Sequence, residues 1–376
     1  MDTAPVSTAT AGTAAAGAAP AHTVPVETLR ALVAAVFRAA GCDPAEAGRI
    51  AHHLVSSNLA GHDSHGVIRV PRYVQWLQDG MVRAGQTPTV AAESATHAVV
   101  DGHLGFGQTV APFAVDLGIA KAREAGLCVV ALRNSGHIGR VGDWAERAAE
   151  AGLVSVHFVN VGLGEIVAPH GGVDRRFGTN PFCVGVPRPG APPLLLDFAT
   201  SQVAEGKVLV ASNGGKPVPH GALIGPDGAL SSDPRTLYGP IEGTHVRDPG
   251  NGEGALRAFG EHKGSGIAFM CEILAGCFAG SPTAGPVGKR GGIVNGMLSF
   301  YLRPDHFGGQ HFATVAADYA AYVKASRPDR PGGEVLVPGE PEARTRAARL
   351  RDGVPLQADT WAAILDTARG LGVPTP

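Results

Sequence analysis

The sequence predicts a mixed α/β (α+β) chain in which a helical N-terminal region precedes a larger α/β region. Apolar residues recur at helical spacing between residues 26 and 78. From about residue 97, short apolar runs alternate with helical patterns, which indicates strand–helix–strand units. The chain also contains 53 glycines and 29 prolines, so we expect many tight turns between short elements.

The composition is that of a globular protein and restricts its partners. Of 376 residues, 44% are hydrophobic and 17% are charged, and the length allows two or three folded regions. A net charge of −2 argues against nucleic acid or a membrane surface as the main partner, because both need a concentrated basic face. A small carboxylate needs only one or two basic side chains, so it is compatible with this charge.

Several features favour a cytoplasmic location. The five cysteines have no C-x-x-C spacing and are typical of buried thiols in a reducing compartment. No run approaches the ~18 apolar residues of a membrane span. Residues 1–25 are rich in Ala, Thr and Pro and lack a basic start, so we expect a disordered tail and not a signal peptide.

The N-terminal helices are predicted from caps and periodicity. Residues 26–40 have the spacing of an amphipathic helix. Asp43 is the expected N-cap of a second helix, with Pro44 at its first position. Pro71 starts a third helix.

The α/β region follows from residue 97. The expected elements are strands at 97–102, 127–132, 153–159 and 194–198, with helices at 109–125 and 142–151. Residues 262–280 predict a long, largely buried helix because most of them are apolar or small. A terminal helix is expected over 361–370.

Glycine-bracketed polar loops are the best candidates for a site. The Rossmann pattern G-x-G-x-x-G and the Walker pattern are both absent. Hydrogen-bonding side chains instead gather in four loops, at residues 61–66, 133–139, 178–181 and 196–201. Any one of these loops alone is more typical of turns and helix caps than of a ligand site.

Three chemistries compete for the Gly61–Gly66 loop. A metal site is poorly supported, because His62 and His65 lack helical i, i+4 spacing and no H-E-x-x-H occurs. A Ser–His–Asp nucleophile is also poorly supported, because adjacent residues rarely reach the facing geometry of a triad. An acid–base histidine is favoured, because imidazole can protonate a developing alkoxide and take the proton back. It needs an orienting carboxylate and a cation for the substrate.

Six blocks, in order, resemble the type-2 malate/L-lactate dehydrogenase family over residues 26–372. They are SNLAGHDSHGVIRVPRYV, RNSGHIGRVGDWAERAAEAGLVS, RFGTNPFCVGVP, LLLDFATS, EHKGSGIAFMCEILAG and LVPGEPEARTRAARLRDGVPL. The family includes sulfolactate, ureidoglycolate and diketogulonate oxidoreductases and a cyclic-imine reductase, and the blocks are nearest to those of bacterial hydroxycarboxylate dehydrogenases.

The resemblance implies a non-Rossmann malate/L-lactate dehydrogenase type-2 fold, which explains the missing glycine fingerprint. It implies NAD or NADP as cofactor and a homodimer or dimer-based oligomer, with the active site near the subunit interface. The expected regions are a helical one at 26–96, a cofactor-binding α/β one at 97–300, and a C-terminal segment at 301–376 that packs back on the helical region.

The resemblance also assigns roles to the active-site residues. His65 matches the acid–base histidine, with Ser64 as its hydrogen-bonding neighbour. Arg69 matches a residue that binds the substrate carboxylate, Tyr73 lies at another substrate-side position, and His137 matches a second active-site histidine. The role of Arg69 fits the chemistry, because arginine can form a bidentate pair with a carboxylate and lysine cannot match that geometry.

Local reasoning adds two expectations about the turn that carries His65. Asp63 and Ser64 can cap the following backbone and fix the imidazole ring. Gly66 leaves space for a ligand.

Cofactor contacts are expected along several of the blocks. Asp197 is expected both to contact the cofactor and to orient His65, although a turn cap is an ordinary alternative. The other expected cofactor residues are Ser135, His137, Gly178, Thr179, Asn180, Pro181, Leu195, Leu196, Lys207 and Lys263.

Two departures from the family pattern concern the pocket. Ser265 stands where many relatives have an aromatic residue, and Asp143–Trp144 where many have an aromatic pair or Gly-Tyr. Because of these two departures, the sequence does not identify the substrate. It also does not decide between NAD and NADP. The leading function is a 2-hydroxyacid:NAD(P) oxidoreductase. The alternatives are a reductase of cyclic 2-carboxy imines on the same scaffold and a family member without catalysis.

Overall fold

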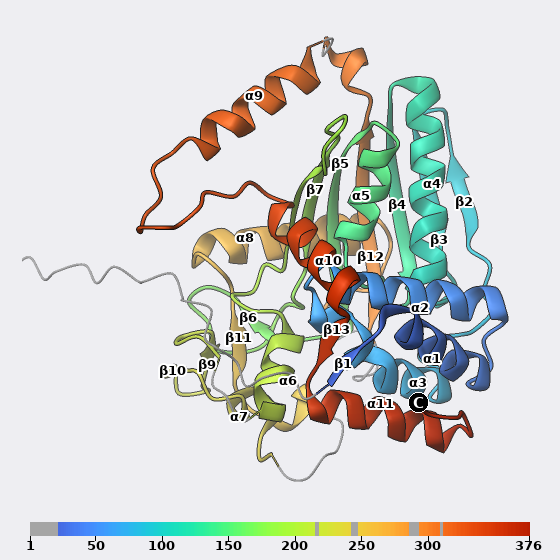
Figure 1. Ribbon diagram of the computed structural model, residues 1–376, viewed down its shortest axis with the longest axis vertical. Coiled ribbons are helices and arrows are strands. Elements are labelled where there is room, and N and C mark those ends of the chain that lie inside the picture. Colours follow the sequence, from blue (N-terminus) through green and yellow to red (C-terminus); the bar gives the residue numbers. More distant parts are fainter. Residues whose placement is uncertain (1–21, 215–217, 242–246, 286–292, 309–310) are drawn as a thin grey trace, which may run out of the picture.

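The structure is a computed structural model that describes residues 22–214, 218–241, 247–285, 293–308 and 311–376. Within these ranges the strands form sheets of seven, four and two strands, with helices around them (Figure 1). The predicted mixed α/β class is therefore confirmed. Of the expected tail, residues 1–21 lie outside the described residues. Residues 22–24, also expected in the tail, instead form a strand, β1 (His22–Val24).

Three N-terminal helices begin and end close to the positions that their caps predict: α1 (Val26–Ala39), α2 (Pro44–Leu59) and α3 (Val70–Gln78). The Asp43 carboxylate accepts the backbone N–H groups of Ala45 and Glu46, at 2.8 and 2.9 Å. A capped terminus of this kind stabilises a helix by about 1 kcal/mol. These helices form one layer beneath the central sheet, and their apolar faces share a core.

The C-terminal segment completes this core. Strand β13 (Val354–Leu356) pairs antiparallel with β1, and helix α11 (Ala358–Gly370) packs along α3. Val354 and Ile364 are fully buried, and burial of such a side chain stabilises by about 1.5–3 kcal/mol. Strand β1, at the start of the described residues, and the C-terminal segment are therefore held together.

The central sheet has the strand order β2-β3-β4-β12-β5-β7-β8. Its strands are β2 (Thr89–Glu93), β3 (His97–Asp101), β4 (Leu127–Ser135), β12 (Val294–Leu302), β5 (Val154–Gly162), β7 (Phe182–Val186) and β8 (Leu194–Phe198). β12 is antiparallel to both β4 and β5, so those two strands run parallel without pairing. β4 also continues to Ser135, three residues beyond its expected end, so the start of the expected loop is strand.

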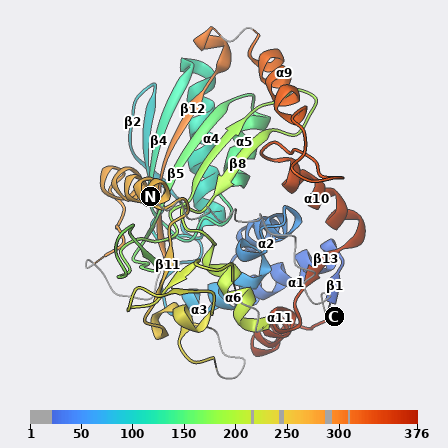
Figure 2. The ribbon, with the colours of Figure 1, turned by 90° about the vertical axis from the view of Figure 1, so that its left-hand side faces the viewer.

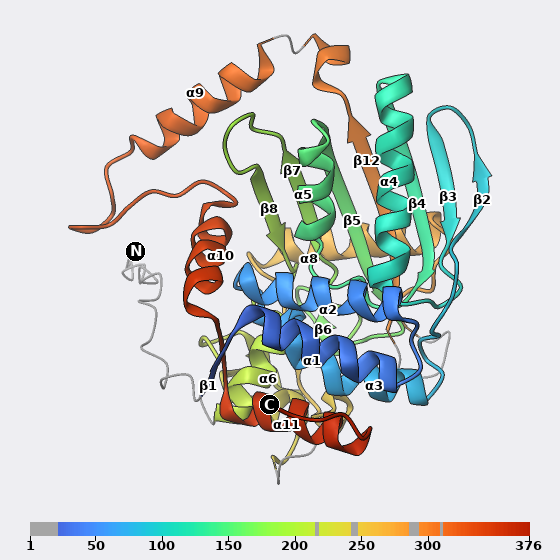
Figure 3. The same cartoon turned by 45° about the vertical axis from the view of Figure 1, so that its right-hand side comes forward.

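Helices α4 (Gly107–Ala125) and α5 (Gly142–Glu150) cover one face of this sheet, and α8 lies against the other (Figure 3). Helix α8 (His262–Cys271) continues as a π-helix (Glu272–Phe278). The expectation of a largely buried helix is wrong here. Ala279 and Leu274 pack toward the sheet, but Phe269 and Phe278 are 53% and 71% exposed, because the apolar residues are divided between the sheet and solvent.

A smaller sheet lies below the central one. Its strands, in order, are β10 (Leu230–Ser231), β9 (Leu223–Ile224), β11 (Ala255–Arg257) and β6 (Val167–Ala168). Helices α6 (Glu205–Gly214) and α7 (Arg235–Tyr238) pack against it around a separate apolar core. The first turn of α6 faces the helical region, which brings the small sheet to the segment that carries His65.

The remaining C-terminal helices behave differently from each other. Helix α10 (Glu340–Asp352) packs on α2. Helix α9 (Phe312–Lys324) projects away from the other elements (Figure 2). Among the described helices, none has the length and apolar character needed to cross a bilayer.

Candidate active site

A cleft of about 680 Å³ lies where the helical region, the small sheet and the end of the central sheet meet. Its walls come from distant parts of the chain: residues 65–76, His137, the end of β5 with the following loop (161–166), the start of α6, and α11. Three residues that the sequence singled out, His65, Arg69 and His137, all line it. The fold therefore brings the first two glycine-bracketed loops into one site.

The turn that carries His65 is held from behind by α2. Two 3-10 turns, Asp63–His65 and Val67–Arg69, follow one another here. The Asn58 Oδ1 atom accepts the Val67 N–H at 2.8 Å, and a Cβ at Gly66 would lie 2.2 Å from that same oxygen. Gly66 is therefore required by Asn58 and does not leave space for a ligand, which corrects that expectation.

Asp63 points away from the site. Its carboxylate receives both terminal nitrogens of Arg349 on α10, at 2.6 and 3.0 Å, and the Asn58 Nδ2 at 2.6 Å. The sequence suggested that Asp63 fixes the His65 ring. It does not, because Arg349 and Asn58 occupy its carboxylate oxygens. The pair instead ties α10 to the base of the active-site turn.

The His65 ring lies between Ser64 and His137. The Ser64 hydroxyl is 3.0 Å from His65 Nδ1, and the His65 and His137 rings stack with centroids 5.7 Å apart and planes 9° from parallel. Burial, then His137 and Arg69, lowers the pKa of His65 well below its usual range. The imidazole is therefore neutral at pH 7 and able to accept a proton.

His137 is oriented by Tyr73. The Tyr73 hydroxyl lies 2.5 Å from His137 Nδ1, while Gln108 Nε2 donates to the Tyr73 oxygen at 3.4 Å. Burial raises the pKa of Tyr73 to about 12, and burial followed by Arg69 lowers the pKa of His137 to about 3. Both groups are therefore neutral at pH 7, so the Tyr73 hydroxyl can donate to Nδ1 and leave the proton of His137 on Nε2.

Tyr73 was expected on the substrate side, and the structure places it elsewhere. Its side chain is 1% exposed and lies behind His137, outside the lining of the cleft. The cleft wall is formed instead by Trp76, one turn later, whose ring stacks on Tyr73 at 5.6 Å. Tyr73 therefore contacts the site through His137.

Arg69 is anchored on one side and unpartnered on the other. Its Nε donates to the Ser64 carbonyl at 2.7 Å, and its Nη2 donates to Glu205 Oε2 at 2.9 Å. Nη1 has no hydrogen-bond partner among the described residues, and Arg69 lines the cleft. Burial alone would lower the pKa of Arg69, but Glu205 raises it, so the guanidinium stays charged.

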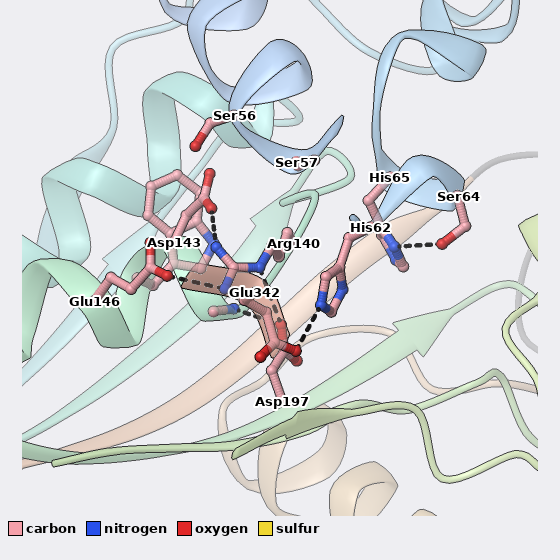
Figure 4. Close-up of polar contacts among 12 residues, drawn as sticks. Ser56, Ser57, His62, Ser64, His65, Arg140, Asp143, Glu146, Asp197 and Glu342 are labelled. Carbon is pink, nitrogen blue, oxygen red and sulfur yellow. Dashed lines mark hydrogen bonds and ion pairs between the residues drawn. The ribbon is translucent and has the colours of Figure 1, made fainter. Parts of the chain in front are cut away.

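Asp197 lies outside the cleft and does not orient His65. Its Oδ2 accepts the Gly142 N–H at 2.8 Å and lies 3.9 Å from Arg140 Nε. Figure 4 shows this carboxylate on the Arg140 side, away from the bond between Ser64 and His65. Burial raises the pKa of Asp197. The side chain holds β8 against α5, which matches its alternative role as a structural cap.

Arg140 forms the centre of this second polar cluster. Its side chain is fully buried, with Nη1 2.9 Å from Asp143 and Nη2 3.0 Å from Glu146. Asp143 also accepts from His53 Nδ1 at 2.9 Å. Among the described residues, no three His, Cys, Asp or Glu side chains lie together as a metal site.

Of the loop 178–181, one residue reaches the cleft. Thr179 lines it, whereas Asn180 is fully buried and donates from Nδ2 to Glu272 and to the Ala268 carbonyl. Gly178 and Pro181 are not part of the lining. Asn180 supports the wall from behind because its amide groups satisfy buried backbone and carboxylate partners.

The other expected cofactor residues also lie apart from the cleft. Ser135 is buried and donates to the Gly136 carbonyl, and Leu195 is buried in the sheet. Leu196 is 40% exposed, and Lys207 and Lys263 are exposed. They were predicted from their positions in the sequence blocks, and none of them lines this cleft.

Sequence reasoning missed several residues of the cleft wall. Trp76 and Arg72 follow Arg69 at helical intervals, so the periodicity of the third helix could have indicated them. Glu205 lies two residues before Lys207, and only the lysine was predicted to bind the cofactor. Asp359 and Asp366 of α11 gave no signal, because only the tertiary fold brings the C-terminal helix to this site.

Comparisons with known proteins agree with this architecture. Residues 24–365 match the family model described as malate/L-lactate dehydrogenase. Hydroxycarboxylate dehydrogenase B of Escherichia coli K12 is 42% identical over 352 residues, which cover 93% of this chain and 94% of that protein.

Two further relatives broaden the comparison. A Δ1-pyrroline-2-carboxylate/Δ1-piperideine-2-carboxylate reductase of Pseudomonas putida is 34% identical and covers 87% of this chain and 91% of its own. A solved E. coli structure assigned as a malate/lactate dehydrogenase superposes with a TM-score of 0.87 at 42% identity, covering 94% of this chain and 96% of its own. Fold, sequence blocks and family model converge, and the chain is an oxidoreductase of the malate/L-lactate dehydrogenase family.

Proposed function

We propose that the protein is an NAD(P)-dependent oxidoreductase that interconverts a small 2-hydroxycarboxylate and its 2-oxocarboxylate. One observation carries this proposal: the stacked His65 and His137 rings meet Arg69 in one cleft, and Arg69 Nη1 has no partner in the part of the chain that the structure describes. A neutral imidazole beside a fixed cation is the arrangement that a hydroxy acid needs, because one group handles the proton and the other the carboxylate.

The cleft is suitable for a nicotinamide dinucleotide. Its volume of about 680 Å³ lies within the roughly 300–1,000 Å³ of small-molecule and cofactor sites. Val161, Leu163 and Thr179 would hold the nicotinamide part, and the Arg72 and Arg176 guanidiniums suit the phosphates. When bound, the nicotinamide exchanges a hydride with the substrate carbon.

His65 carries out the proton transfer in this proposal. In the oxidative direction the neutral ring accepts the hydroxyl proton as the hydride leaves, and in the reductive direction it returns that proton to the forming alkoxide. Ser64 fixes the ring through Nδ1, which leaves Nε2 for the substrate. His137, held by Tyr73, provides the facing ring of the pocket and adds no charge at pH 7.

Arg69 binds the substrate carboxylate in this proposal. Its Nε and Nη2 are occupied by Ser64 and Glu205, so the carboxylate is received by the free Nη1 side. Fixing the carboxylate next to His65 sets the 2-position of the substrate near the imidazole. This positioning is the part of catalysis that a rigid guanidinium supplies.

A cyclic-imine reductase is a second candidate, and the 34% identity to the Pseudomonas putida enzyme favours it. The same site serves that reaction, because His65 would protonate the imine nitrogen and Arg69 would hold the 2-carboxylate. The two candidates differ in the shape of the substrate and not in the residues used.

The proposed assembly is a homodimer. On α8 and its π-helix, Phe269, Met270 and Phe278 are 53%, 44% and 71% exposed, and on α9, Tyr319 and Tyr322 are 67% and 76% exposed. Clusters of this kind on separate elements are typical of subunit contacts. The five unpaired cysteines, of which four are buried, fit the proposed cytoplasmic location.

One experiment tests the reaction. The purified protein is mixed with NADH or NADPH and a panel of 2-oxo acids and cyclic 2-carboxy imines, and loss of the reduced nicotinamide absorbance is followed. We expect turnover of at least one 2-oxo acid, a loss of kcat of about 10²–10⁴-fold in His65→Ala, and a rise in KM of about 10- to 150-fold in Arg69→Ala. Arg147→Ala, in an exposed ion pair, is the control.

Each result has a defined meaning. Turnover of cyclic imines alone would replace the first function with the second. Unchanged kinetics in both His65→Ala and Arg69→Ala would overturn the assignment of the site.

A further inference from the structure

Among the described residues, Glu205 is the one acidic side chain that forms an ion pair with the Arg69 guanidinium. It is the first residue of α6, and its Oε2 lies 2.9 Å from Arg69 Nη2, with the two side chains only 14% and 12% exposed. Its other oxygen, Oε1, accepts the Tyr238 hydroxyl at 2.6 Å. Both carboxylate oxygens are therefore committed, one to Arg69 and one to the buried Tyr238 of helix α7.

We infer that Glu205 is a positioning residue for Arg69: it fixes the guanidinium so that Nη1 faces the cleft and receives the substrate carboxylate. This inference rests on the proposed function, because it deepens the role given there to Arg69. Glu205 acts through Arg69 and is not assigned a contact with the reacting atoms.

The backbone of α6 is held rigidly against the active-site turn. A Cβ built at Gly206 would lie 2.5 Å from Ser64 Cβ and 3.0 Å from the Ser64 carbonyl oxygen, so only glycine allows this approach. The same Ser64 carbonyl accepts Arg69 Nε at 2.7 Å. The contact of α6 with Ser64 therefore fixes both acceptors of Arg69, the carbonyl and the carboxylate, relative to each other.

The charge of Glu205 is stable in this place. Burial alone would raise the pKa of its carboxyl, but Arg69, the hydrogen bond from Tyr238, and Arg72 hold it below its usual range. The carboxylate is therefore ionised at pH 7 and compensates the charge of Arg69 when no substrate is bound. Compensation of this kind lets a cation remain in a partly buried site.

Fixing an arginine in this way improves binding without a new contact to the ligand. A free arginine side chain samples many rotamers, and ordering it on binding costs affinity. With Nε and Nη2 already bonded, the rotamer is set before the substrate arrives. The substrate then loses less binding free energy to ordering, and its carboxylate approaches from one side only.

The test is a double-mutant cycle in the full chain, with a 2-oxo acid that the wild type reduces. Glu205→Ala and Arg69→Ala are measured singly and together, with KM for the oxo acid, KM for the nicotinamide cofactor and kcat as separate readouts. We expect Glu205→Ala to raise the oxo acid KM by about 10-fold and the cofactor KM by less than about twofold. In the Arg69→Ala background it should have no further effect beyond about twofold.

Conservative variants separate positioning from folding. Glu205→Gln keeps an acceptor oxygen for Arg69 and should recover part of the affinity lost in Glu205→Ala. Gln202→Ala is the matched control, because Gln202 is exposed and lies three residues before Glu205. Thermal unfolding of each variant establishes that the chain is folded.

The outcomes distinguish this inference from the proposed function. A normal oxo acid KM in Arg69→Ala would overturn the role of Arg69 itself. A raised KM in Arg69→Ala with an unchanged KM in Glu205→Ala, or equal losses from Glu205→Ala in both backgrounds, would overturn the positioning role alone.

Discussion

Two buried arginines, Arg69 and Arg140, differ in how completely their charge is neutralised. Arg140 has three carboxylates within 4.0 Å and a side chain with no exposure. Arg69 has one, Glu205, and its Nη1 is unpartnered among the described residues while the side chain opens on a cleft. An arginine with excess anionic partners stabilises the fold, whereas one with a deficit has capacity for an anionic ligand. The balance of partners therefore supports the proposed division between a structural arginine, Arg140, and a substrate-binding arginine, Arg69.

The largest expected effect is on stability, in Arg140→Met. Three carboxylates would lose their shared cation in a buried place, so we expect the free energy of unfolding to fall by about 3–5 kcal/mol. Chemical denaturation measures it. The control is Arg147→Met, whose ion pair with Asp116 is 46% and 52% exposed and should contribute only about 0–1 kcal/mol. Equal losses in the two variants would remove the contrast between buried and surface arginines.

A smaller stability loss is expected in Arg69→Met. Glu205 would keep the hydrogen bond from Tyr238, and the site is open to water on the cleft side, so we expect about 1–3 kcal/mol. The same denaturation series measures it beside Arg140→Met. If Arg69→Met were the more destabilising of the two, the division into a structural and a binding arginine would be wrong.

The smallest expected effect is a shift in a pH profile. Arg69 contributes to the lowered pKa of both histidines, after burial in His137 and after burial and His137 in His65. Removing its charge in Arg69→Met therefore raises both pKa values. Oxidation needs a neutral imidazole, so in the wild type kcat/KM for oxidation should stay level as the pH falls through 6.5. In Arg69→Met the fall in activity should begin at a higher pH. A profile that does not move would show that Arg69 has no electrostatic effect on the histidines.

The elements that the sequence predicted well are those with local signals. The Asp43 cap, the proline at the start of α2 and the glycine after α4 lie within a few residues of the ends that they mark. The position of β12 between β4 and β5 had no such signal, because its partners lie more than a hundred residues earlier. Pairing over that separation depends on the packed sheet and not on neighbouring residues.

The apolar run of α8 shows a different limit. Its composition predicted burial, yet Phe269 and Phe278 face outward. The same apolar residue types occur in a core and on a surface that contacts another subunit. Composition alone therefore does not distinguish a buried side chain from an exposed one.

For the site, it was easier to predict which residues take part than to predict where their side chains point. His65, Arg69 and His137 meet in the cleft, but Tyr73 and Asp197 lie behind the wall or beyond it. Tyr73 and Trp76 lie on the same helix and both rings contact His137, but only the Trp76 ring lines the cleft. Such directions follow from packing between distant segments.

The place of β12 also sets the order in which the molecule can be completed during synthesis. Without β12, the strands β2-β3-β4 and β5-β7-β8 form two separate three-stranded sets that share no hydrogen bonds. They become one sheet only after residues 294–302 have been made, and these residues end about four fifths of the way along the 376-residue sequence. Until then both inner edges present unpaired N–H and C=O groups, and such edges are open to pairing with another chain.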